Sequence, residues 1–155
     1  MKIRSVKLKK KREMFEIKTS SRTYGFPFSK SSPLPTCENP IKTARVDKEI
    51  GSEGLEYELA SGETGTIHIE QILEYNNDPN YLRDQLLYKL TQEAQRRVAD
   101  SPLSKREIIR RLGTSATQFY RLLDQTNYSK SVDQLVSLLQ ILDCEVDLLV
   151  RAKSA

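Results

Sequence analysis

The first half of the chain alternates between apolar and polar side chains, a pattern typical of β-strands that bury one face. The alternating apolar residues are Phe15, Ile17, Leu55, Tyr57, Leu59, Ile67 and Ile69. Turn-forming residues separate these runs, because residues 9–12 are suited to close a first hairpin and residues 61–63 a tight second one. The pattern predicts a small antiparallel β domain over residues 1–75, and we find no internal repeat in it.

The second half has the period of amphipathic helices, with apolar residues at every third or fourth position. Leucines and other apolar residues at four-residue intervals predict a first helix over residues 80–99, with Asp78 or Asn80 as its N-cap. A leucine-rich helix is predicted after Ser131, which is suited to cap it. Apolar and charged residues then alternate over residues 144–151, which predicts a short terminal strand.

Two short helices joined by a tight turn are predicted between these two longer helices. Ser104, followed by Glu107 three positions later, forms a capping box and opens a helix that ends at Gly113. Thr114 or Ser115 then caps the next helix. Because only a residue that tolerates positive φ ends a helix so abruptly, the two helices should cross at a steep angle, with the second facing outward.

These elements predict an α+β fold. A small antiparallel β domain over residues 1–75 precedes an all-helical, helix-turn-helix domain over residues 80–155 that ends in a short strand. A length of 155 residues suits one ordinary domain or two small ones, and the absence of a long apolar run argues against a membrane span. Cys37 and Cys144 lie far apart without a partner motif, so we expect reduced thiols and a cytoplasmic location.

The net charge of +4 conceals three regions of different charge. Residues 1–30 carry a net charge of +8, residues 31–79 of −7, and residues 80–155 of +3. The predicted helical pair is basic as well, because residues 105–123 contain five bases and one acid. Neutralisation of phosphates requires such a local excess of Lys and Arg, so the charge favours a polyanionic partner.

Residues 103–115, 118–123 and 131–142 together resemble the phage-repressor/Cro class of helix-turn-helix regulators. The features that match are the turn glycine, its flanking apolar positions and the leucine-rich helix that follows. Within that class, residues 80–151 are most similar to small bacterial proteins that include the HigA-type antitoxins. The resemblance implies a sequence-specific transcription regulator that binds double-stranded DNA as a homodimer. The candidates for the interface between the two protomers are the leucine-rich helix and the terminal strand.

The resemblance places the DNA contacts on the two short helices and on the loop that follows them. The expected DNA-binding residues are Lys105, Arg106, Thr114, Ser115, Ala116, Thr117, Gln118, Tyr120, Arg121, Tyr128 and Lys130. Arg121 is best suited to read guanine with two hydrogen bonds, and Thr117 to hydrogen-bond a base or to contact a thymine methyl. Two positions depart from the class: Lys105 replaces a usual glutamine, and Ile109 replaces a usual small residue, which implies a wider crossing.

A function of a different class is a protein-binding module, such as an antitoxin whose β domain binds a basic partner protein. Its candidate surface is the acidic middle of the chain, with Glu53, Glu56, Glu58, Glu63, Glu70 and Glu74. The basic run between Lys7 and Arg12 fits either a solvated hairpin turn or an arm that reaches phosphates. His68, the one histidine, alternates with isoleucines and is expected to be structural.

The sequence contains no pattern that indicates catalysis. A glycine-rich phosphate loop, a cluster of metal ligands and a nucleophile motif are all missing from it. We therefore expect neither enzyme activity nor a metal ion or other cofactor.

Overall fold

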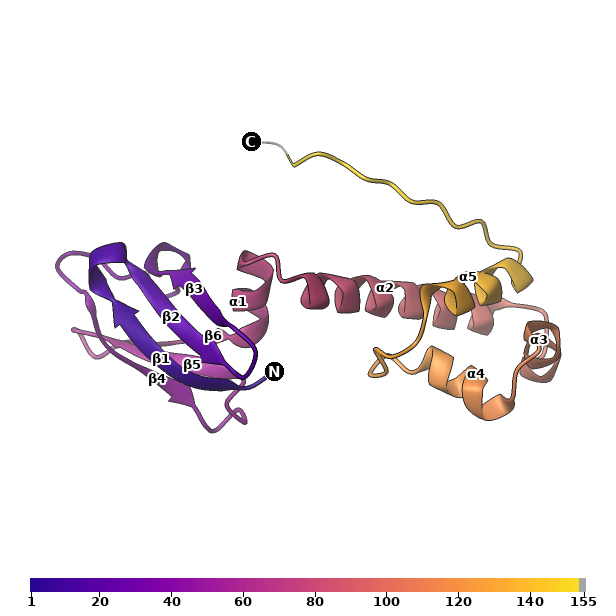
Figure 1. Ribbon diagram of the computed structural model, residues 1–155, viewed down its shortest axis with the longest axis horizontal. Coiled ribbons are helices and arrows are strands. Elements are labelled where there is room, and N and C mark those ends of the chain that lie inside the picture. Colours follow the sequence, from indigo (N-terminus) through magenta and orange to yellow (C-terminus); the bar gives the residue numbers. More distant parts are fainter. Residues whose placement is uncertain (154–155) are drawn as a thin grey trace. The chain divides into compact units, whose positions relative to one another are not determined.

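The computed structural model describes residues 1–153, which form a mixed α+β structure (Figure 1). The chain divides into two compact units, Met1–Leu82 and the part from Arg83 onward. The division falls inside helix α2 (Pro79–Asp100), shortly after the predicted boundary between residues 75 and 80. The last two positions of the predicted range 80–155 lie outside the described residues. No helix among residues 1–153 is both long and apolar enough to cross a membrane.

The first unit contains two antiparallel sheets of three strands each, with strand orders β1–β2–β3 and β4–β5–β6. The strands are β1 (Ile3–Lys9), β2 (Met14–Thr19), β3 (Thr23–Pro27), β4 (Ile41–Asp47), β5 (Gly54–Leu59) and β6 (Thr64–His68). Both predicted hairpin turns are confirmed. The 3₁₀ turn η1 (Lys10–Arg12) joins β1 to β2, and Gly62 takes a φ of 91° between β5 and β6. A second 3₁₀ turn, η2 (Phe28–Lys30), follows β3.

The two sheets repeat one design, although the sequence shows no evident repeat. In each sheet the three strands have 7, 6 and 5 residues, and the first strand carries a register shift near its start. Equivalent backbone hydrogen bonds follow the third strands, from Phe28 N–H to the Glu13 carbonyl (2.9 Å) and from Ile69 N–H to the Glu53 carbonyl (2.8 Å). Two sequences without an evident repeat can form the same backbone arrangement, because many different side chains fit one pleated surface.

The buried faces of both sheets contribute to one hydrophobic core. All seven apolar residues that alternate in the sequence are buried in it, and the period-two prediction is confirmed for the six that lie on strands, all but Ile69. Phe15 lies near the middle of this core, where its ring centroid is 4.8 Å from that of Phe28 and 5.5 Å from that of Tyr57. The Tyr57 hydroxyl donates a hydrogen bond to the Pro33 carbonyl at 2.7 Å, so its polar end is satisfied within the fold.

The structure corrects the prediction for residues 69–75, which form helix α1 (Ile69–Tyr75) and not the end of a strand. The buried side chains of α1 are Ile69, Ile72 and Leu73. This spacing marks one face of a helix. His68 caps the helix, because its Nδ1 accepts the Glu70 N–H at 3.5 Å while the Gln71 side chain accepts the His68 N–H at 2.9 Å. His68 thus holds the structural position that the sequence predicts for it.

The second unit is built from α2 together with α3 (Lys105–Leu112), α4 (Ala116–Leu123) and α5 (Val132–Ile141). The predicted helix over residues 80–99 is confirmed as α2, and the predicted cap Asp78 accepts backbone N–H groups of its first turn. One core joins the four helices, formed by Leu87, Ala94, Val98, Ile108, Phe119, Leu122, Leu135, Leu138 and Leu139. The earlier part of the apolar stripe on α2 is not buried, since Leu86 is 67% exposed.

The predicted terminal strand is absent from the described residues. Residues 144–153 follow α5 without regular secondary structure (Figure 1). Their apolar side chains stay in solvent: Val146, Leu148, Leu149 and Val150 are 42%, 83%, 71% and 80% exposed. Alternation alone does not produce a strand here, because a strand needs a neighbour that pairs with its backbone and covers its apolar face.

Candidate nucleic-acid interface

A short turn joins α3 and α4, and local signals define both helices as the sequence predicts. Ser104 caps α3, with its Oγ accepting the Glu107 N–H at 3.2 Å. Gly113 ends α3 in the left-handed conformation, with a φ of 68°. Ser115 caps α4 in the same way as Ser104 caps α3, because its Oγ accepts the Gln118 N–H at 3.2 Å.

Helix α4 buries one face and exposes the other. Phe119 and Leu122 are 0% and 5% exposed and hold the helix in the core of the second unit. The exposed residues at the start of α4 and on its outer face are Ser115, Ala116, Thr117, Gln118, Tyr120 and Arg121. Lys105 and Arg106 at the start of α3 are exposed as well, whereas Thr114 in the turn is half-buried.

The start of α3 and the outer face of α4 lie side by side. Lys105 Nζ lies 5.9 Å from the centroid of the Tyr120 ring, a cation–π distance. The structure therefore brings together the predicted contacts from two different helices. The side chains of Arg106 and Arg121 form no ion pair within residues 1–153, so their guanidinium groups face solvent.

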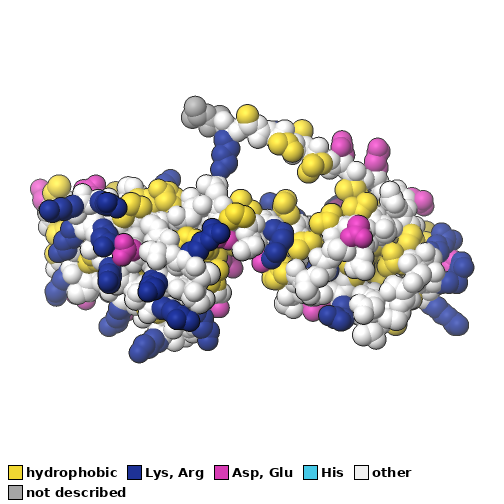
Figure 2. Space-filling model, in the orientation of Figure 1, with side chains coloured by type: hydrophobic (Ala, Val, Ile, Leu, Met, Phe, Trp, Pro, Cys, Tyr) yellow, Lys and Arg dark blue, Asp and Glu magenta, His cyan; other side chains and the backbone are white. Residues whose placement is uncertain are grey.

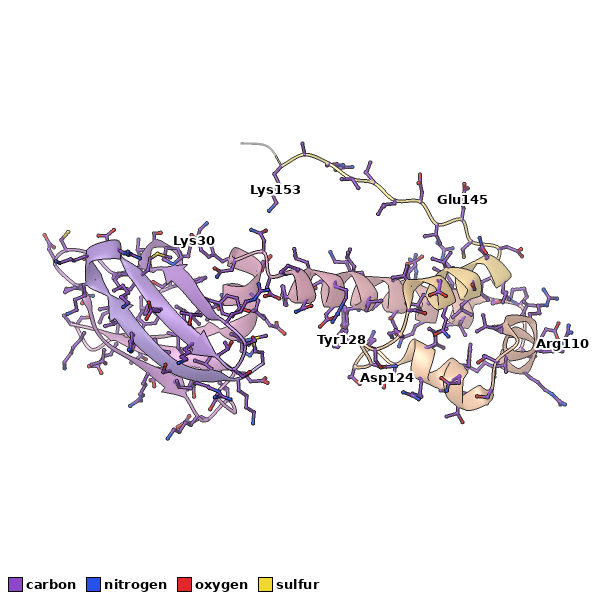
Figure 3. The ribbon with its side chains drawn as sticks, in the orientation of Figure 1. Lys30, Arg110, Asp124, Tyr128, Glu145 and Lys153 are labelled. Atoms are coloured by element: carbon purple, nitrogen blue, oxygen red, sulfur yellow. The ribbon has the colours of Figure 1, made fainter. Side chains whose placement is uncertain are left out.

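Glu107 is the one acid of α3, and its carboxylate binds two arginines of the same helix. Arg110 Nη2 donates to Glu107 Oε1 at 2.6 Å, and Arg111 Nε donates to the same oxygen at 2.9 Å. These hydrogen bonds lower the pKa of Glu107 to about 2, so the carboxylate is charged at neutral pH. Glu107 thus does not complete the predicted capping box. Both arginines remain exposed to solvent, and Figure 3 labels Arg110 on α3.

Side chains from elsewhere in the second unit hold the C-terminal end of α4. Gln95 on α2 donates from Nε2 to the Leu123 carbonyl at 2.7 Å, and Asn127 donates from Nδ2 to the Arg121 carbonyl at 3.1 Å. These carbonyls belong to the last turn of α4, where carbonyl groups have no N–H partner within the helix. Neither donor can be identified from the sequence, because an amide side chain does not indicate a hydrogen-bond partner that lies 28 residues away, as Leu123 lies from Gln95.

Lys130 also serves the end of α4. Its Nζ donates to the Leu122 carbonyl at 2.9 Å and to the Asp124 carbonyl at 2.6 Å. Burial lowers the pKa of Lys130, with the nearby carboxylate of Asp124 acting in the opposite direction. Two of the three ammonium protons are therefore used inside the unit, which leaves Lys130 less suited to a phosphate than the sequence suggests.

The loop between α4 and α5 exposes the remaining predicted contact, Tyr128. The Tyr128 side chain is 40% exposed and lies near Asp124 on the same loop (Figure 3). Ser131 stands at the N-cap position of α5 but makes no capping hydrogen bond to the helix backbone. It donates to Asp133 instead, and this hydrogen bond lowers the pKa of the Asp133 carboxyl.

Lys and Arg side chains gather at the α3 end of the second unit, where Figure 2 shows them in dark blue.

In the first unit the acids of β5 are paired with bases of β4: Glu56 binds Arg45 Nη2 at 2.6 Å, and Glu58 lies 3.6 Å from Lys42 Nζ. Such cross-strand pairs stabilise a sheet. Glu56 and Glu58 are thus paired within the sheet, whereas Glu63, Glu70 and Glu74 form no ion pair among residues 1–153.

The basic run between Lys7 and Arg12 forms the tip of the β1–β2 hairpin. Lys9 Nζ lies 3.4 Å from Glu16 Oε2, and the three residues of η1 are exposed. This arrangement fits a solvated turn.

No group of three or more His, Cys, Asp or Glu side chains within residues 1–153 is placed to hold a metal ion. Cys37 and Cys144 are both free thiols.

Comparisons with known proteins give no relative of this chain. No protein-family model, no curated protein and no solved structure matches it.

Proposed function

We propose that the second unit binds double-stranded DNA through α3, the turn and α4, with the N-terminal half of α4 in the major groove. The observation that carries the proposal is a short helix with an exposed polar and basic face that is fixed at both ends. Ser115 holds the start of α4, and Gln95, Asn127 and Lys130 hold its end. A helix fixed in this way keeps its side chains in place when it meets a rigid duplex.

The exposed residues divide by chemistry into two roles. Lys105 and Arg106, at the start of α3, contact phosphates and set the position of the unit on DNA. Arg121 reads a guanine through two hydrogen bonds, and Thr117 contacts a neighbouring base edge. Bound in this way at a promoter, the protein acts as a regulator of transcription.

The first test is a selection of bound sequences from random duplex DNA, followed by a titration at several salt concentrations. We expect one enriched motif and a clear fall of affinity with salt, because each neutralised phosphate contributes about 0.9 to the slope of log K against log salt. An absence of any enriched motif together with a slope near zero would refute the proposal.

The second test compares Arg121→Ala with the matched variant Arg96→Ala. Arg96 is an exposed arginine that pairs with Glu93 on the same helix, α2, and is not among the predicted DNA contacts. Arg121→Ala should lower the discrimination between the best sequence and its variants by about 1 to 3 kcal/mol. Arg96→Ala should leave this discrimination unchanged. Equal effects of both variants would remove Arg121 from the reading surface.

A further inference from the structure

The segment after α5 exposes a run of apolar side chains. Val146, Leu148, Leu149 and Val150 lie in solvent within five consecutive residues, and Leu148 is the most exposed large apolar residue, at 83%. The segment begins at a fixed point, because Cys144 N–H donates to the Leu139 carbonyl of α5 at 2.9 Å. An apolar run of this kind, anchored at one end, is typical of a surface that a partner covers.

The sequence of this segment, residues 145–151, is complementary to itself when two copies run in opposite directions about Leu148. Glu145 of one copy then lies opposite Arg151 of the other, so that opposite charges meet at both ends. Val146 lies opposite Val150, a pair of β-branched side chains that fits a pleated sheet. On the two-fold axis, Leu148 faces its own copy.

The opposite direction of pairing is unfavourable. If two copies paired in parallel and in register, Glu145, Asp147 and Arg151 would each lie beside an identical charge. In the antiparallel register none of these three residues faces its own kind. The charges therefore select the antiparallel arrangement, and the even-numbered apolar side chains, from Cys144 to Val150, share one face of the resulting ribbon.

We propose that residues 145–151 form a β-strand only on meeting a second copy of this chain, and that the two antiparallel strands join two protomers about Leu148. Pairing supplies the backbone hydrogen bonds that the isolated segment lacks, which explains the strand pattern in a segment without a strand. In this register the two Cys144 residues lie about 27 Å apart, at about 3.3 Å per residue. This dimer deepens the proposed function and rests on it in one respect. If the second unit binds DNA, two joined protomers meet a two-fold DNA site whose half-sites lie about 34 Å apart.

The test uses charge exchange in the full chain and measures mass by sedimentation velocity without DNA, so that its outcome is independent of DNA binding. Wild-type protein should show a reversible monomer–dimer equilibrium over roughly 1 to 200 µM. Glu145→Arg and Arg151→Glu should each raise the dissociation constant about tenfold or more, because each places like charges together at both ends of the ribbon. An equimolar mixture of the two variants should restore dimers, since each mixed dimer regains two opposite-charge pairs.

Asp147→Arg is the matched control, because it makes the same change of charge two residues away, opposite Leu149. Mixed with Arg151→Glu, it should restore dimers much less well than Glu145→Arg does. A wild-type chain that stays monomeric over the whole range would overturn the proposal. So would single variants that dimerise like the wild type, or a mixture of Glu145→Arg and Arg151→Glu that stays as weak as its components.

Discussion

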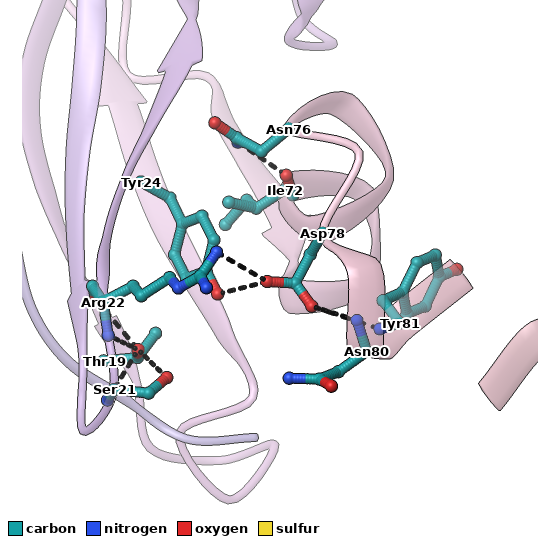
Figure 4. Close-up of polar contacts among 9 residues, drawn as sticks. All are labelled: Thr19, Ser21, Arg22, Tyr24, Ile72, Asn76, Asp78, Asn80 and Tyr81. Carbon is teal, nitrogen blue, oxygen red and sulfur yellow. Dashed lines mark hydrogen bonds and ion pairs between the residues drawn. The ribbon is translucent and has the colours of Figure 1, made fainter. Parts of the chain in front are cut away.

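Removal of the Asp78 carboxylate tests how the first unit holds the start of α2. Asp78 is 4% exposed, and its Oδ1 accepts the N–H groups of Asn80 and Tyr81, both at 3.1 Å (Figure 4). Its other oxygen, Oδ2, accepts the Tyr24 hydroxyl at 2.9 Å and lies 3.8 Å from Arg22 Nη1. One side chain therefore caps the helix and ties it to strand β3.

The expected loss follows from these contacts. Loss of an N-cap costs about 1 kcal/mol, and a buried tyrosine hydroxyl left without its charged partner costs about 2 kcal/mol more. Asp78→Ala should therefore lower the free energy of unfolding by about 3 kcal/mol. Asp78→Asn keeps an oxygen for the cap and should lose about half as much.

The carboxylate also makes stability depend on pH. Burial by itself raises the pKa of Asp78, but the hydrogen bonds from Tyr81, Tyr24 and Asn80 and the charge of Arg22 outweigh it, so the pKa lies below 3.8. A carboxyl with a lowered pKa stabilises the fold above its unfolded pKa, and this contribution is lost as the pH falls through the folded pKa. Asp78→Asn should thus lose less stability than the wild type on acidification below about pH 4.

Urea unfolding of the full chain measures these changes, with tyrosine fluorescence as the signal because the chain has seven Tyr and no Trp. Asp84→Ala is the matched control, since Asp84 lies on the same helix and, among residues 1–153, its carboxylate pairs only with its exposed neighbour Arg83. A loss at Asp78→Ala below about 1 kcal/mol, or no larger than at Asp84→Ala, would refute this account of the contact.

Two further predictions concern the α3–α4 pair. Gly113→Ala should cost about 1 kcal/mol through backbone strain alone, because a Cβ at Gly113 meets no atom within 4 Å, and Gly113→Asn should cost less; thermal melts followed by circular dichroism test both. Lys130→Met should cost about 1 to 2 kcal/mol in the same melts, because the carbonyls of Leu122 and Asp124 lose their donor, and an unchanged melting temperature would contradict this role.

Hydrogen bonds between near neighbours in sequence account for what the chain reveals without a structure. Ser104, Gly113 and Ser115 each act on backbone groups within four residues, so the bounds of α3 and α4 can be predicted from them. The exposed face of α4 follows as well, because burial of Phe119 and Leu122 leaves the other side of a helix in solvent. Most of the candidate site is thus readable from the sequence.

Other features depend on partners that are distant in the chain. The sequence assigns Ile69 to a strand, but its neighbours Ile72 and Leu73 complete a helical face that packs into the core of the sheets. Lys130 has the charge expected of a phosphate contact. Its ammonium group instead donates to carbonyls at the end of α4, which only the fold brings within reach.

The sequence by itself determined the periods of two and of about four along the chain, the helix caps, and the basic character of the α3–α4 pair, because each is a property of residues close together. The tertiary structure decided that two unlike sequences fold into equivalent sheets, that Gln95 holds the end of a helix 28 residues away, and that residues 145–151 stay without a strand. The physical reason is the same in each case: a hydrogen bond or an apolar face is satisfied only by a partner, and the fold decides which partner is near.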